Sequence, residues 1–165
     1  MIAPMKLHLF VLFFLLLNSV TVSAWGHLLE VNSVKINLLI PTIVWYAITS
    51  RDGAQGVLVI AITGFLYDLV SSNNIGTYIL AMSATYLLIR YVVAHASMEF
   101  WWQRLLLVVM ISFIFQAALR TATGYIETVW PWGALQAVAD GLVSLGLFPI
   151  FHGLVPLLEQ RDANE

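Results

Sequence analysis

The feature that most constrains this chain is a series of long apolar segments. A helix needs about 20 mostly apolar residues to cross a bilayer, and six segments come close to that length, at residues 6–25, 35–50, 54–70, 75–94, 104–121 and 133–155. The apolar runs are continuous and do not alternate with polar residues, which excludes a transmembrane β-barrel. The sequence therefore predicts an all-α integral membrane protein, a single domain over 1–165 that forms a six-helix transmembrane bundle.

Composition agrees with a protein that is solvated by lipid. Of the 165 residues 61% are hydrophobic and only 10% are charged, and the mean hydropathy is +0.90, whereas about 25% of the residues in a soluble domain are charged. No basic patch indicates a nucleic-acid partner. The chain has no cysteine, which excludes disulfides and thiolate metal sites. The four histidines show no metal-ligand spacing.

Positive charges set the predicted orientation. With the N-terminus inside, the cytoplasmic segments hold five positive residues and the outer segments hold two: Lys6, Arg51, Arg90, Arg104 and Arg161 against Lys35 and Arg120. The positive-inside rule then predicts a multi-pass membrane protein with both termini in the cytoplasm. All six tryptophans lie near predicted helix ends, the aromatic-belt pattern of a membrane–water interface.

The first segment has a second interpretation. Lys6, the apolar run over 7–17 and the small residues at 22–24 also fit a cleavable secretory signal. Cleavage would leave five spans and the same orientation, so charge counting does not separate the two. The apolar character continues to Trp25 with only Asn18 as a strong interruption, which favours a retained span.

Polar residues inside membrane helices are costly and are read first as functional sites. The fifth and sixth predicted helices each carry three of them, spaced four residues apart: Ser112, Gln116 and Arg120 on one, and Gln136, Asp140 and Ser144 on the other. Residues four apart share one helix face, and the two helices run antiparallel, so the two stripes match in depth.

These stripes and the third helix predict one polar cluster in the outer half of the bundle. Its members are Asp68, Gln116, Arg120, Gln136 and Asp140. Two acids and one arginine leave a surplus carboxylate, which is either protonated or compensated by water or a partner. Interhelical polar contacts in membranes often act only as packing contacts, so a structural network is the favoured interpretation and a partner or ligand site the alternative.

Small residues on the third and fourth predicted helices indicate close packing between them. Gly64 stands one turn before Asp68, so the acid is expected on the packed face and away from lipid. The polar turn "SSNN" at 71–74 includes residues able to cap the next helix. Asp68 precedes this turn by one helical turn, and its oxygens are placed to accept amide hydrogens from it.

No catalytic arrangement is visible in the sequence. No Gly-x-Ser-x-Gly elbow and no phosphate-binding loop occur, so the protein is predicted to be neither an enzyme nor the holder of a metal or cofactor. His152 is interpreted as a packed or interfacial histidine rather than a base. The cytoplasmic loop "AHASMEFWWQR" at 94–104 is short and aromatic, and is interpreted first as an interfacial anchor and second as a docking surface.

Two stretches resemble a known family. In "GFLYDLVSSNNIG" the pattern Gly-x-x-x-Asp-Leu-x-x-x-x-x-x-Gly falls on Gly64, Asp68, Leu69 and Gly76, and "INLLIPTIVWYAITSRDG" follows the second span of the same family. With its length and six spans, the chain resembles the bacterial rod shape-determining protein MreD family.

The resemblance implies a non-enzymatic scaffold in the bacterial inner (cytoplasmic) membrane. It would belong to the cell-elongation (rod) complex, which is involved in cell shape and in the regulation of peptidoglycan synthesis. The implied partners are MreC and, indirectly, the MreB filament, the glycosyltransferase RodA and its transpeptidase, together with membrane lipids. The implied fold is similar to that of the substrate-binding subunits of energy-coupling-factor (ECF) transporters. That similarity supplies the alternative function, the substrate-binding subunit of a vitamin transporter of this type.

Overall fold

The computed structural model describes residues 4–25, 30–31, 34–35, 38–50, 53–71, 76–96, 98–122 and 129–160. It contains six α-helices: α1 (Pro4–Trp25), α2 (Leu39–Thr49), α3 (Gly53–Ser71), α4 (Thr77–His95), α5 (Trp101–Ala122) and α6 (Ala134–Gln160). Strands β1 (Glu30–Val31) and β2 (Val34–Lys35) pair antiparallel, and a π-helical turn, η2 (Val129–Gly133), leads into α6. Each predicted apolar segment coincides with one helix, so the prediction of six helices is confirmed.

Three of the helices are long and apolar enough to cross a membrane. Within the described residues these are Thr77–His95, Trp101–Ala122 and Ala134–Leu154. Lys6–Val20, Leu39–Thr49 and Gly53–Leu69 form shorter apolar helices. These lengths and compositions indicate a membrane protein.

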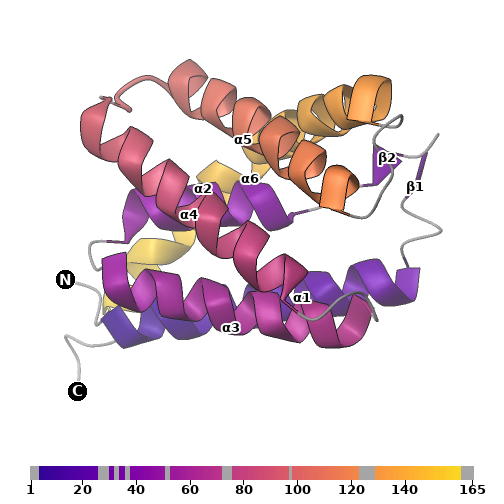
Figure 1. The fold of residues 1–165 in the computed structure, drawn as a ribbon. Coiled ribbons are helices and arrows are strands. Elements are labelled where there is room, and N and C mark those ends of the chain that lie inside the picture. Colours follow the sequence, from indigo (N-terminus) through magenta and orange to yellow (C-terminus); the bar gives the residue numbers. More distant parts are fainter. Residues whose placement is uncertain are drawn as a thin grey trace.

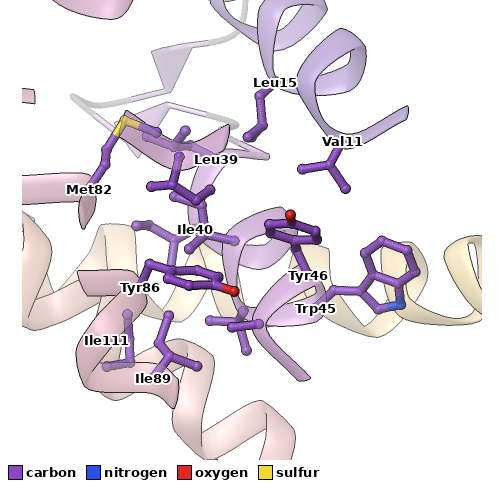
Figure 2. Close-up of a cluster of buried hydrophobic side chains, with 14 of the residues drawn as sticks. Val11, Leu15, Leu39, Ile40, Trp45, Tyr46, Met82, Tyr86, Ile89 and Ile111 are labelled. Atoms are coloured by element: carbon purple, nitrogen blue, oxygen red, sulfur yellow. The ribbon is translucent and has the colours of Figure 1, made fainter. Parts of the chain in front are cut away.

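The shortest helix, α2, occupies the centre of the molecule. It contacts all five other helices, and residues 39–47 are all buried. Figure 2 shows its side chains between Val11 and Leu15 of α1 on one side and Tyr86 and Ile89 of α4 on the other. At 1.5 Å per residue α2 is about 16 Å long, about half of the apolar thickness of a bilayer. A helix that is apolar all round is expected in such a buried position.

The other helices form two antiparallel pairs and α1 around this centre. α3 packs mainly on α4, α5 packs mainly on α6, and α1 lies along α3 (Figure 1). The start of α1, the end of α6 and the turn from α4 to α5 lie at one end of the bundle, and β1–β2 lies at the other. We call these the terminal end and the β end.

The tryptophans near predicted helix ends differ in exposure, and one of them does not have the surface position that an aromatic belt requires. Trp101, Trp102 and Trp130 are exposed at helix ends. Trp45 instead is buried, with its ring centroid 4.6 Å from that of Phe151. It stands near the end of α2, but α2 is covered on all sides by other helices, so nearness to a helix end does not bring this side chain to the surface.

Candidate functional site

Asp68, in the last turn of α3, is 1% exposed and binds the start of α4. Its Oδ2 accepts hydrogen bonds from the backbone N–H of Gly76 at 2.9 Å and of Ile79 at 3.2 Å, and its Oδ1 accepts one from Tyr78 at 2.9 Å. The first N–H groups of a helix have no acceptor within that helix. Asp68 therefore caps α4 from the preceding helix, which confirms that it lies on a packed face and accepts amide hydrogens beyond the turn.

Two glycines make this arrangement geometrically feasible. A Cβ at Gly64 would lie 2.8 Å from the Ile79 Cα and 2.9 Å from its backbone nitrogen, so only glycine lets α3 approach α4 this closely. Gly76 has φ +104°, in the left-handed region that favours glycine, while a Cβ there would meet nothing within 4 Å. Each residue has a separate role: Gly64 permits the close approach, Asp68 accepts the hydrogen bonds, and Gly76 adopts the positive φ. We call these three residues the α3–α4 joint.

Leu69 is the member of the sequence motif that does not belong to this joint. Its side chain is 56% exposed, whereas Asp68 beside it is buried. The helix turns by about 100° per residue, so consecutive residues face different surroundings. The Leu69 side chain points away from the packed face of α3 and lies on the outer surface of the protein.

Asp140 is the centre of a second buried polar group, between α5 and α6. Ser112 of α5 donates its hydroxyl to Asp140 Oδ2, and Gln136, one turn earlier on α6, donates its Nε2 to Oδ1 at 2.7 Å. All three side chains are buried. Ser144 donates to the Gly141 carbonyl oxygen instead. We call Ser112, Gln136 and Asp140 the α5–α6 cluster.

The five-residue cluster predicted from the sequence is thus distributed over two places. Gln136 and Asp140 meet as expected, with Ser112, whereas the hydrogen bonds of Asp68 described above go to the backbone of α4. Gln116 and Arg120 are half-buried in the second half of α5. The pairing of Arg120 with Asp68 or Asp140 stays a prediction.

Sequence reasoning did not assign roles to several polar contacts around α2. The Arg90 Nη1 donates to the carbonyl oxygens of Ala47 at 3.1 Å and Ser50 at 2.5 Å, and so caps the C-terminal end of α2 from α4. The carbonyls at a helix end lack intrahelical donors, which makes them acceptors for a cation. The sequence feature that could have indicated this role is the position of Arg90 inside an apolar run. An arginine is tolerated there only when it is packed against other polar groups or lies at an interface.

Two polar side chains of α1, His8 and Asn18, hold this helix in place. His8 Nε2 donates to Gln55 Oε1 at 2.8 Å, since that oxygen only accepts, and His8 Nδ1 is hydrogen-bonded to the Tyr46 hydroxyl at 2.5 Å. Near the β end, Asn18 donates to the Tyr67 hydroxyl at 2.8 Å. Asn18 interrupts the first apolar run, which indicates that this residue has a polar partner. The sequence does not identify the partner, because Tyr67 is 49 residues away.

Both carboxylates act structurally, by holding neighbouring helices together. Asp68 and Asp140 use both oxygens to accept hydrogen bonds from the protein itself. Among the residues that the structure describes, no group of three histidine, cysteine, aspartate or glutamate side chains is arranged to hold a metal ion. No protein-family model, curated protein or solved structure matches the chain.

Proposed function

We propose that this protein is a non-enzymatic membrane scaffold of the bacterial cell-elongation complex, of the MreD type. The observation that carries the proposal is the α3–α4 joint. Three of the four motif residues that carry the resemblance hold α3 and α4 together, with Asp68 bonded to three backbone N–H groups. A motif that builds a rigid helix pair suits a protein that presents surfaces to partners.

The proposed topology is six crossings of the inner membrane with both termini in the cytoplasm. Three helices have the length and hydropathy for this, and the start of α1 and the end of α6 lie at the same end of the bundle. The predicted excess of lysine and arginine assigns that terminal end to the cytoplasm. The shortness of α2 is compatible with a crossing because irregular backbone at membrane depth is tolerated where protein surrounds it.

The proposed mechanism is partner binding. MreC is the direct partner, and through it the MreB filament, RodA and its transpeptidase are held in one assembly. Leu69 is the motif residue offered to a partner helix, since it is exposed while Gly64 and Asp68 face α4. In lipid such a helix contact is stabilised by close packing rather than by a hydrophobic driving force.

Gentle detergent purification of the tagged full chain, with mass spectrometry of the co-eluting material, tests this function. We expect MreC and cell-wall synthases to co-elute. A pair of ATPases or a bound vitamin-sized molecule would contradict the scaffold and support the ECF transporter subunit.

A matched pair of variants tests the partner surface in the same experiment. Leu69→Ala should lower the recovery of MreC severalfold, while Leu142→Ala, which truncates a leucine of similar exposure on α6, should leave recovery unchanged. Equal recovery with both variants would show that the partner does not lie on this face of α3.

A further inference from the structure

Three consecutive aromatic side chains stand exposed at the terminal end of the bundle. Phe100, Trp101 and Trp102, at the turn from α4 to α5, are 57%, 67% and 51% exposed, and the rings of Phe100 and Trp102 stack at 6.3 Å. Exposing this much aromatic surface to water is costly. Tryptophan is most favourable at the headgroup level of a bilayer, where its ring has apolar and polar neighbours.

The guanidinium of Arg104, two residues after Trp102, carries a positive charge that no acidic side chain among the described residues pairs with. Its Nε donates to the Met98 carbonyl oxygen at 3.1 Å and its Nη1 to His152 Nε2 at 3.3 Å. In the described part of the chain it makes no ion pair, and Glu99, exposed before the aromatic residues, is not bonded to it. A guanidinium has five N–H donors, so most of its donors remain for a ligand.

His152 adds a donor of its own to the same place. Because Arg104 can only donate, His152 Nε2 accepts, and the neutral ring then carries its proton on Nδ1. His152 is exposed on α6, so its side chain is accessible from outside. Two helices therefore contribute donors to one place, and the guanidinium is held at Nη1 by His152 and at Nε by the Met98 carbonyl oxygen.

The position of Arg104 along α5 corresponds to a headgroup layer. From Arg104 to Arg120 no charged residue occurs, and the helical rise makes this distance about 24 Å. The two arginines thus bracket most of the roughly 30 Å apolar layer of a bilayer. At such a depth an arginine meets lipid phosphates.

We propose that Arg104 and His152, framed by Trp101 and Trp102, bind the phosphate group of an anionic phospholipid in the headgroup layer at the terminal end of the bundle. The guanidinium matches a phosphate in charge and in its planar arrangement of donors, and the tryptophans contact the adjoining glycerol and upper acyl region. This site depends on the membrane location of the protein and not on the scaffold function.

Native mass spectrometry of the full chain in mild detergent tests the site. Phosphatidylglycerol is titrated against phosphatidylcholine with the same acyl chains, since only the first carries net charge. We expect tighter binding of phosphatidylglycerol by the wild type and roughly fivefold weaker binding by Arg104→Gln. Arg120→Gln, which removes a charge at the other end of α5, is the matched control and should retain wild-type affinity, because the Arg120 Nε is buried inside the protein.

Three results would overturn the proposal. They are equal affinity of the wild type for the two lipids, equal loss in Arg104→Gln and Arg120→Gln, and displacement of phosphatidylglycerol by millimolar inorganic phosphate, which would make the site one for free anions. If Arg104→Gln fails to fold, His152→Ala gives a second reading, because it leaves the arginine in place and should weaken phosphatidylglycerol binding about twofold. Unchanged binding in His152→Ala would then contradict the site.

Discussion

Asp68 and Asp140 are buried to the same degree, each 1% exposed, but they are satisfied in different ways. Asp68 accepts three hydrogen bonds from backbone N–H groups of one helix start. Asp140 accepts two from side chains, one on a neighbouring helix and one on its own. The first arrangement depends on the path of the backbone, and the second depends on which residues stand at two other positions.

Because of this difference, the α3–α4 joint cannot rearrange its hydrogen bonds, whereas the α5–α6 cluster can. Backbone donors at a helix start cannot turn elsewhere, and only substitution by proline removes one, so the α3–α4 joint requires a carboxylate at position 68 and glycine where the chains approach. Ser112 can turn its hydroxyl to a carbonyl of its own helix when its acceptor is lost. We therefore expect the α3–α4 joint to be the more sensitive of the two regions.

The largest expected effect is that of Asp68→Ala. It leaves three N–H groups of α4 without their acceptor, and we expect it to lower the free energy of unfolding by about 3 kcal/mol. Unfolding in mixed micelles, followed by circular dichroism as denaturing detergent is added, measures this. Asp140→Ala is the matched control and should cost clearly less. An equal loss in both variants would remove the distinction between the two regions.

Gly64→Ala tests the close approach of α3 and α4. The new methyl group would meet backbone atoms of Ile79 and Tyr78 at 2.8–2.9 Å, and these cannot move aside without separating the helices. We expect a loss of about 2 kcal/mol in the same assay. At Gly146 a Cβ would meet nothing within 4 Å, so Gly146→Ala should be neutral or stabilise by up to about 1 kcal/mol. Similar destabilisation by both would show that packing is not the cause.

Gly76→Ala isolates the conformational part of the joint. No neighbour obstructs a Cβ there, but φ +104° is strained for any residue with a side chain. We expect a loss of about 1 kcal/mol, from strain alone. Gly76→Asn should lose less than Gly76→Ala, because asparagine tolerates positive φ better. The reverse order in a thermal unfolding series would contradict this role.

The smallest effect is expected in the α5–α6 cluster. Ser112→Ala removes one of the two donors to Asp140 and should cost about 0.6 kcal/mol, the average for interhelical hydrogen bonds in a membrane protein. Asp140→Asn should cost less than Asp68→Asn, because the Ser112 hydroxyl can accept a hydrogen bond from the new amide nitrogen, whereas the backbone N–H groups that face Asp68 can only donate. A Ser112→Ala loss larger than that of Gly64→Ala would reverse the comparison.

The α3–α4 joint was accessible from the sequence because its residues are close in the chain. Gly64, Asp68 and Gly76 lie within 13 positions, so helical periodicity and turn chemistry place them together. The partners of Asp140 were only partly accessible. Gln136 is one turn away on the same helix, but the choice of Ser112 as the second donor depends on how α5 and α6 pack.

The sequence by itself determined where the helices are. In an apolar surrounding every backbone polar group has to be satisfied within the segment, so a long apolar run is a helix whatever its neighbours are. The local cap of α4 by Asp68 follows from the same requirement. These features need only residues that are near one another in the chain.

Tertiary structure alone decided which helix occupies the centre. In a chain of this composition, side chains that face the core and those that face lipid are both apolar, so hydropathy does not distinguish the faces. Trp45 is therefore buried on the central α2 while Trp101 is exposed. The capping of α2 by Arg90 from α4 follows from that arrangement as well.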